Sequence, residues 1–363
     1  MISPKGFLRA SGTSMAEARW DGSQWIVAST PVPQGLTETD VDGLRNLLGV
    51  RVLWPSSAVP LDVILQLAAA GIPLHSSVVP RWLADDPLGA LVLDGRWLEP
   101  EKDSSGVSIA ELRREEHSVR LRRHGLRRTD HSRRPGSVSV ILPSRRPWMA
   151  AFALKQIAQQ RDVDLEVVYA AHGFPADAVR EAAREFPFPI EIMEIDGETV
   201  FGDVLNTAIE RAGGDYVAKW DDDDWYGQDH LSDLLLAKAY SGADLVGMSA
   251  EFFYLEPLNV TIRRAKFISE ITTNLVAGGT IMMERTALKE LGGFRPLPRA
   301  VDSALLATVG ESGGTVYRTH GLGYMLLRGL TEQHTWLQPL SQFLRSSANQ
   351  WRGFRPTQIL EGS

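Results

Sequence analysis

The sequence predicts an α/β protein whose main domain is a mostly parallel sheet covered by helices. Beyond residue 136, four short apolar segments alternate with segments that have helical spacing. The apolar segments are continuous rather than alternating, as is typical of strands buried on both faces. Helices between consecutive strands are the usual crossovers of a parallel sheet. Together these observations favour a sheet with helices on both of its faces.

The elements of this domain follow in order along the chain. We expect strands at 138–142, 165–171, 190–195 and 216–220, and helices at 149–159, 176–186 and 204–212. Gly213-Gly214 ends the last of these helices. Parallel sheets bind ligands outside the carboxyl ends of their strands. The segments 143–146, 171–173 and 221–224 are therefore the places to look for a site.

Residues 1–110 predict a smaller α/β region, with strands at 50–54 and 72–76 around a helix at 60–70 that stops at Gly71. An arginine-rich helix or linker follows at 111–136. It has two interpretations: a patch for nucleic acid or anionic lipid, or a solvated helix with internal Glu–Arg pairs. We favour the second, because this stretch has no aromatic residues for base stacking. The main domain then covers 137–336, and a helical tail is expected at 337–363.

Composition excludes several classes of protein. The 363 residues include no cysteine, which excludes disulfides, cysteine nucleophiles and zinc-thiolate sites. The formal net charge of −7 argues against nucleic acid as the main partner. No apolar run is long enough to cross a bilayer, and the N-terminus lacks the apolar stretch of a secretory signal. We therefore expect a cytoplasmic protein.

The most informative feature is the run Asp221-Asp222-Asp223-Asp224, directly after the apolar segment 216–220. Adjacent carboxylates repel one another, and burial increases that cost. A hard divalent cation such as Mg²⁺ or Mn²⁺ offsets it and keeps positions for phosphate oxygens. The alternative is an acidic surface loop before a helix that begins near Asp229. The position at the carboxyl edge of a sheet favours the metal site.

These residues belong to a series of motifs that stand in a recognisable order. The series comprises VSVILPS at 138–144, VLNTAIERAGGDYV at 204–217, the aspartate run as Asp-x-Asp-Asp, Gly-Gly-Thr at 278–280, Leu-Gly-Gly-Phe at 291–294 and Asp302. With them, residues 137–336 resemble the family 2 glycosyltransferases, which have the GT-A fold with a Rossmann-like nucleotide-binding core. The resemblance implies a divalent cation and a nucleotide-sugar donor, with a UDP-sugar favoured. It also implies inverting transfer to an acceptor hydroxyl.

The resemblance also implies roles for individual residues. Asp302 falls where the family places its catalytic base, Asp221 and Asp223 where it places metal contacts, and His334 where a C-terminal histidine reaches the metal or diphosphate. The implied contacts with the nucleotide sugar come from Pro143, Ser144, Arg145, His172, Asn206, Asp221, Asp222, Gly279 and Arg328. The sequence departs from the family pattern at His172, Val301 and Thr308, where acidic residues and an arginine are usual. The frame Asp222/Asp224 stays open beside Asp221/Asp223.

Several alternatives remain at this stage. Asp302 could instead cap a helix at 303–309, and Trp225 and Tyr226 could belong to the core rather than to a sugar site. A metal-dependent nucleotidyltransferase and a non-catalytic glycan- or nucleotide-binding protein are the competing functions. The tail has a basic amphipathic pattern, which suits a membrane surface or packing on the domain, with packing favoured. The acceptor (a glycan, a lipid-linked glycan or a small molecule) and assembly into a homo-oligomer are left open.

Overall fold

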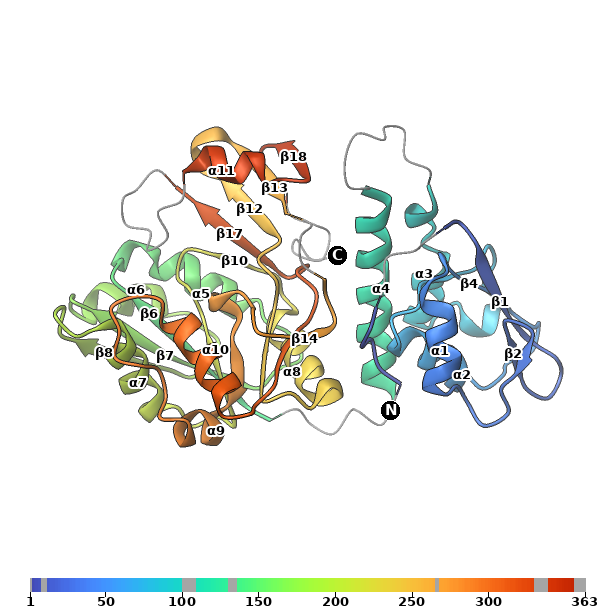
Figure 1. The fold of residues 1–363 in the computed structure, drawn as a ribbon, viewed down its shortest axis with the longest axis horizontal. Coiled ribbons are helices and arrows are strands. Elements are labelled where there is room, and N and C mark those ends of the chain that lie inside the picture. Colours follow the sequence, from blue (N-terminus) through green and yellow to red (C-terminus); the bar gives the residue numbers. More distant parts are fainter. Residues whose placement is uncertain are drawn as a thin grey trace. The chain divides into compact units, whose positions relative to one another are not determined.

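A computed structural model of the chain describes residues 2–7, 12–99, 109–129, 136–264, 268–329 and 339–355. The chain divides into two compact units, Met1–Arg134 and Pro135–Ser363 (Figure 1). The break falls at the arginine- and proline-containing segment where the sequence pattern changes. Among the helices of the described segments, none is both long and apolar enough for a bilayer span.

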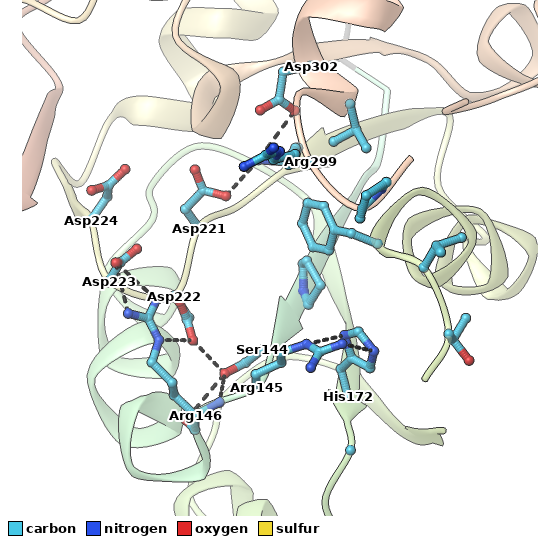
Figure 2. A pocket seen from close by; sticks show the side chains of 18 of the residues that line it. Ser144, Arg145, Arg146, His172, Asp221, Asp222, Asp223, Asp224, Arg299 and Asp302 are labelled. Carbon is cyan, nitrogen blue, oxygen red and sulfur yellow. Dashed lines mark hydrogen bonds and ion pairs between the residues drawn. The ribbon is translucent and has the colours of Figure 1, made fainter. Parts of the chain in front are cut away.

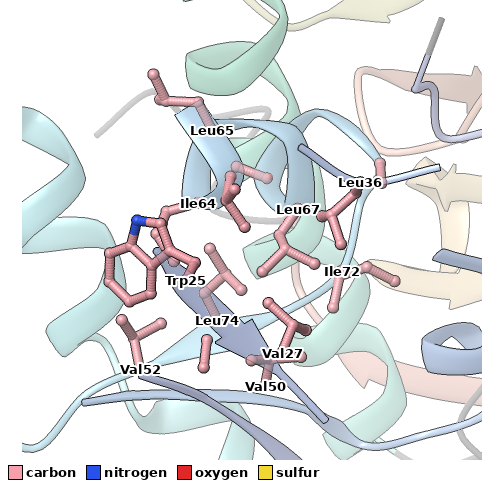
Figure 3. Close-up of a cluster of buried hydrophobic side chains, with 14 of the residues drawn as sticks. Trp25, Val27, Leu36, Val50, Val52, Ile64, Leu65, Leu67, Ile72 and Leu74 are labelled. Carbon is pink, nitrogen blue, oxygen red and sulfur yellow. The ribbon is translucent and has the colours of Figure 1, made fainter. Parts of the chain in front are cut away.

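Unit 1 contains a five-stranded sheet in the order β3-β2-β1-β4-β5. Its strands are β1 (Met15–Trp20), β2 (Trp25–Val27), β3 (Thr30–Pro31), β4 (Gly49–Leu53) and β5 (Leu74–His75), and its helices are α1 (Glu38–Arg45), α2 (Asp62–Ala69), α3 (Pro87–Leu93) and α4 (Ile109–Arg128). The expected strand–helix–strand unit is confirmed as β4, α2 and β5, with β4 and β5 parallel. Apolar side chains of the sheet and of α2 form the core, where Trp25, Ile64 and Leu74 are buried together (Figure 3).

The arginine-rich helix α4 belongs to this unit, and the expectation of a solvated helix or linker is wrong for one of its faces. Ten of its residues are buried. Arg114 is among them and donates hydrogen bonds to the backbone carbonyls of Leu48 (2.7 Å) and Leu47 (2.9 Å). A Cβ at Gly125 would lie 2.5 Å from the backbone nitrogen of Ala69, so the glycine lets α4 pack tightly on α2.

Unit 2 is built on an eight-stranded sheet in the order β14-β16-β11-β15-β9-β6-β7-β8. Its strands are β6 (Val138–Ser144), β7 (Leu165–His172), β8 (Ile190–Ile195), β9 (Tyr216–Lys219), β11 (Leu245–Gly247), β14 (Ile271–Thr273), β15 (Met282–Glu284) and β16 (Val316–Arg318). The four strands expected from the sequence are β6 to β9, and their neighbours within this set are all parallel. The sheet as a whole is mixed, because β15 is antiparallel to both of its neighbours, β9 and β11.

Helices cover both faces of this sheet. They are α5 (Ala150–Ala158), α6 (Asp177–Ala183), α7 (Phe201–Arg211), α8 (His230–Ser241), α9 (Arg285–Glu290) and α10 (Val301–Glu311). Apolar residues of α7, α9 and α10 share one core with side chains of the sheet, including Val204, Leu288 and Leu305. In Figure 1, α5 and α6 lie across the sheet from α7 and α9. Burial on both faces explains why every residue of β6 is buried.

A second sheet of unit 2 has the order β10-β17-β12-β13-β18. Its strands are β10 (Trp225–Tyr226), β12 (Phe252–Leu255), β13 (Val260–Arg263), β17 (Tyr324–Arg328) and β18 (Asn349–Arg352), with α11 (Leu340–Arg345) beside it (Figure 1). The expected helical tail is therefore only partly helical. Phe343 of α11 packs into the core of this sheet, and β18 pairs antiparallel with β13. These contacts agree with packing on the domain, the alternative that the sequence favoured.

Candidate active site at the carboxyl ends of the central strands

A cleft of about 900 Å³ opens where β6, β7 and β9 end (Figure 2). The carboxyl ends of these parallel strands meet at one edge of the sheet, as their registers require. Residues 197–201, residues 298–302 at the start of α10, and residues of β17 contribute further parts of the lining. The sequence-predicted site residues that line it are Pro143, Ser144, Arg145, Arg146, His172, Asp221, Asp222, Asp223, Asp224, Asp302 and Arg328. The parallel-sheet rule thus located the cleft from the sequence.

Alternate members of the aspartate run are buried. Asp222 is 5% exposed and Asp224 6%, whereas the side chains of Asp221 and Asp223 are 31% and 21% exposed. Asp224 accepts hydrogen bonds from the hydroxyl of Tyr324 and from the backbone N–H of Leu327. Burial and the charges of its neighbours raise the pKa of Asp224 well above its ordinary value.

The turn after β6 holds the middle of the run. Arg146 donates from Nε to Asp222 (3.2 Å) and from Nη1 to Asp223 (3.0 Å), and the hydroxyl of Ser144 donates to Asp222 (Figure 2). Burial alone would lower the pKa of Arg146, but the two carboxylates outweigh it and the pKa is raised. Arg146 lines the cleft, but its guanidinium group is hydrogen-bonded to these two aspartates and is not a solvated loop charge.

Lys219 joins the first aspartate of the run to Asp302. Its Nζ lies 2.6 Å from Asp221 Oδ1 and 3.4 Å from Asp302 Oδ1. Burial raises the pKa of Asp302, the charge of Lys219 opposes that rise, and the charge of Asp221 adds to it. Asp302 is the second residue of α10, whose N-cap is Ala300, so the N-cap interpretation of Asp302 is wrong.

Two glycines leave room for these carboxylates. A Cβ at Gly278 would lie 2.1 Å from Asp302 Oδ2, and one at Gly279 would lie 2.6 Å from Asp221 Oδ2. The hydroxyl of Tyr226 accepts from the backbone N–H of Asp221 (2.9 Å) and donates to the carbonyl of Gly279 (3.0 Å). Tyr226 is 1% exposed, which confirms the core interpretation for this aromatic residue.

Arg145, directly after β6, pairs with His172, the last residue of β7. Arg145 Nε donates to His172 Nδ1 (3.1 Å), and Arg145 Nη2 donates to the carbonyl of Gly197 (2.7 Å) (Figure 2). Burial, and then the charge of Arg145, lower the pKa of His172, so the imidazole is neutral at neutral pH. This face of the cleft presents a guanidinium and a neutral imidazole where the resembled family has a carboxylate.

The structure does not bring every predicted residue into the cleft. Asn206 exchanges two hydrogen bonds with the backbone of Phe294, both 2.8 Å, and thereby fixes the Leu-Gly-Gly-Phe segment. The carbonyl of Gly279 accepts a hydrogen bond from Tyr226, and Gly279 is not among the lining residues. His334 lies outside the described residues.

The sequence did not single out several of the lining residues, among them Lys219, Trp148 and Arg299. Lys219 was visible as the one charged residue of an otherwise apolar strand, Tyr-Val-Ala-Lys-Trp. Trp148 is 65% exposed, and a large exposed aromatic beside polar groups is a common feature of binding sites. Arg299 precedes α10 in a segment that carried no motif.

The donor set of the cleft fits a hard divalent cation. Asp221 and Asp223 supply carboxylate oxygens, the ligand type that Mg²⁺ and Mn²⁺ take. In the described parts of the chain, no group of three or more His, Cys, Asp or Glu residues is arranged as a complete metal site. Two carboxylates suffice where phosphate oxygens and water provide the remaining ligands.

Comparison with known proteins relates part of this chain to a known family. Residues 139–292 match the family described as glycosyl transferase family 2. None of the curated proteins matches the chain. Residues 1–349 of TarS from S. aureus, solved with UDP-GlcNAc, are 16% identical, with 58% of this chain and 64% of that chain covered and a TM-score of 0.44. The mannosyltransferase PcManGT from Pyrobaculum calidifontis, solved with GDP-Man and Mn²⁺, is 18% identical, with 75% and 69% covered and a TM-score of 0.45.

The family match and the TarS match each cover only part of this chain. This chain spans about 64% of the length of the TarS fragment. The family match begins inside β6 and ends just after α9, so it includes the aspartate run and stops before Asp302. Over this segment, which is less than half of the chain, the sequence matches glycosyl transferase family 2.

Proposed function

We propose that the protein is a metal-dependent, inverting glycosyltransferase that moves a sugar from a nucleoside-diphosphate sugar to an acceptor hydroxyl. The donor favoured is a UDP-sugar, and the acceptor is a glycan, a lipid-linked glycan or a small molecule. One observation supports the proposal above the others: Asp221, Asp223 and Asp302 line one cleft at the carboxyl edge of the sheet.

The aspartate run is suited to the diphosphate end of the donor. Asp221 and Asp223 are its more exposed members, whereas Asp222 and Asp224 are buried on protein partners. This alternation favours the frame Asp221/Asp223 for the cation. A Mg²⁺ or Mn²⁺ ion held there would neutralise the charge that develops on the departing nucleoside diphosphate. Arg299 and Arg328 also line the cleft and bring positive charge to the same leaving group.

Asp302 is suited to accept the proton of the acceptor hydroxyl. Inverting transfer needs one carboxylate beside the attacking oxygen. Asp302 lines the cleft at the start of α10. Its raised pKa favours proton uptake during the reaction, while Lys219 limits the rise so that the carboxylate can still ionise. The cleft-lining position of Trp148 suits a flat platform for a sugar or base.

The direct test is incubation with a panel of UDP-, GDP- and CDP-sugars in Mn²⁺ and in Mg²⁺. We expect one donor to release free nucleoside diphosphate, and excess chelator to abolish the release. Release of pyrophosphate would instead indicate a nucleotidyltransferase. Binding of nucleotide sugar with no release, across acceptors of the three classes, would indicate a non-catalytic protein. Undiminished release in chelator would contradict the metal role of the aspartates.

A further inference from the structure

Lys219 occupies a position in which a charged side chain is costly. It is the last residue of strand β9, and its side chain is 3% exposed. Its backbone N–H donates a hydrogen bond to the carbonyl of Ile281 (2.9 Å). An ammonium group taken out of water without compensation is strongly destabilising. Here the compensation comes from two carboxylates, those of Asp221 and Asp302, which both lie within ion-pair distance of Nζ.

The two carboxylates that compensate Lys219 come from different parts of the chain. Asp221 follows β9 directly, whereas Asp302 comes from the first turn of α10. Nζ lies 2.6 Å from the first and 3.4 Å from the second. The ion pair thus links the metal side of the site to the residue proposed as its base. Gly278 and Gly279 leave the space that this arrangement needs.

We propose that Lys219 is the built-in counter-ion of the site, which holds Asp302 beside Asp221 and shares Asp221 with the divalent cation. This inference rests on the proposed function, because it assigns the cation to Asp221. Lys219 is a positioning residue. It fixes the separation of the two carboxylates, and its positive charge opposes the binding of a second cation at the same aspartate.

A role for Lys219 in folding alone predicts a different change in metal affinity from the counter-ion role. If Lys219 only supported the fold, its loss would loosen Asp221 and weaken or leave unchanged the affinity for the cation. If Lys219 is the counter-ion, its loss removes a positive charge that competes for Asp221, and the affinity rises. The sign of the change in affinity therefore separates the two roles.

The test measures Mn²⁺ binding to the full chain with UDP, by electron paramagnetic resonance of free Mn²⁺. We expect Lys219→Met to bind Mn²⁺ about tenfold more tightly than wild type. The charge-conserving Lys219→Arg should stay within about twofold of wild type. Thermal unfolding supplies a second readout: Lys219→Met should have a lower Tm than wild type, and Mn²⁺ with UDP should raise that Tm more than it raises the wild-type Tm.

The double variant Lys219→Met/Asp302→Asn tests the link to Asp302. Without Lys219, Asp221 and Asp302 repel one another, so removing the charge of Asp302 should restore part of the lost Tm. If Lys219→Met alone does not fold, Mn²⁺ binding of this double variant is compared with Asp302→Asn, and tighter binding by the double variant is expected. Equal or weaker binding would overturn the inference and leave the proposed function standing. A wild-type protein that binds no Mn²⁺ with UDP would overturn the metal role and this inference together.

Discussion

Arg146 and Asp222 form an ion pair in which the carboxylate is buried and the guanidinium is half-buried, and the guanidinium also contacts Asp223. Removing one member of a buried pair leaves an uncompensated charge. We expect Arg146→Met to lower the free energy of unfolding by about 3 kcal/mol. Urea denaturation followed by circular dichroism measures this loss.

A second variant shows whether the loss belongs to the pair. Arg146→Met/Asp222→Asn removes the buried charge but keeps an acceptor for the hydroxyl of Ser144. We expect it to recover about half of the lost free energy, with Asp223 accounting for the rest. The single variant Asp222→Asn completes the comparison. If the double variant loses as much free energy of unfolding as the two single variants together, Arg146 and Asp222 do not stabilise one another.

Asp302→Asn should reduce transfer at least about 100-fold while nucleotide binding stays near normal. The amide keeps the size of the side chain but cannot accept the proton, a step that contributes about 10²- to 10⁴-fold in general base catalysis. Turnover of the donor identified for the wild type and calorimetric binding of UDP with Mn²⁺ check the two halves. An enzyme that keeps most of its turnover would show that another group takes the proton.

Gly279→Ala should disrupt the site without unfolding the protein. Its Cβ would lie 2.6 Å from Asp221 Oδ2 and 2.8 Å from the hydroxyl of Tyr226, so the first aspartate must move. We expect Mn²⁺ affinity with UDP to fall about tenfold or more.

The matched control for this variant is Gly310→Ala. Gly310 lies within α10, where a Cβ would meet nothing within 4 Å. Alanine is the better helix former, so this variant should raise the free energy of unfolding by about 0.5–1 kcal/mol with unchanged Mn²⁺ binding. Equal losses of Mn²⁺ affinity in both variants would point to a general effect of the substitution rather than to contact with Asp221.

Unit 1 should lose stability as the pH falls from about 6.5 to about 4. Burial lowers the pKa of His117 to about 4, while its ordinary value is 6.5. Over that interval the unfolded chain takes up a proton that the folded unit does not, so the folded state is disfavoured by up to about 3 kcal/mol at the acid end. The ring stacks on Trp97 and its Nε2 bonds the carbonyl of Leu74 (2.8 Å), which requires that nitrogen to carry the hydrogen.

Hydrogen–deuterium exchange of α4 peptides, corrected for the intrinsic effect of pH, reports this loss. We expect protection to fall between pH 7 and pH 5 in the wild type and to fall less in His117→Gln, which keeps a donor for Leu74. His172→Gln, in unit 2, serves as the control and should leave the exchange of α4 as it is in the wild type. A pH dependence that is identical in wild type and His117→Gln would exclude His117 as its cause.

The sequence predicted the central strands of unit 2 well because burial on both faces makes each strand a continuous apolar run. The starts of β6 to β9 coincide with the expected ones, and their ends differ by at most two residues. The same parallel order brought the ends of β6, β7 and β9 to one cleft. The sequence could not predict which distant residues a polar side chain bonds. Asn206 bonds the backbone of Phe294, 88 residues away, and no local pattern marks that contact.

The arginine-rich helix shows a different limit. Its apolar stripe is weak, because buried arginine and histidine side chains satisfy backbone carbonyls where an ordinary helix would place leucine. Periodicity counts such residues as polar and therefore predicts exposure. The prediction of a helical tail is partly wrong for a related reason. The four residues of β18 form a strand because they pair with β13, and their own sequence pattern does not indicate it.

The aspartate run begins at the end of β9 in the large sheet and ends beside β10 in the small one. Asp221 pairs with Lys219 of β9 in the large sheet, while Asp224 is bonded to Tyr324 and Leu327 of the small one. The outer strand of the small sheet is β18, close to the C-terminus. Shortening the chain from that end would expose the edge of the sheet that holds Asp224. A nonsense mutation near residue 348 lies well outside the family match, which ends at residue 292. It would nevertheless remove β18 and weaken the sheet whose residues Tyr324 and Leu327 bond Asp224.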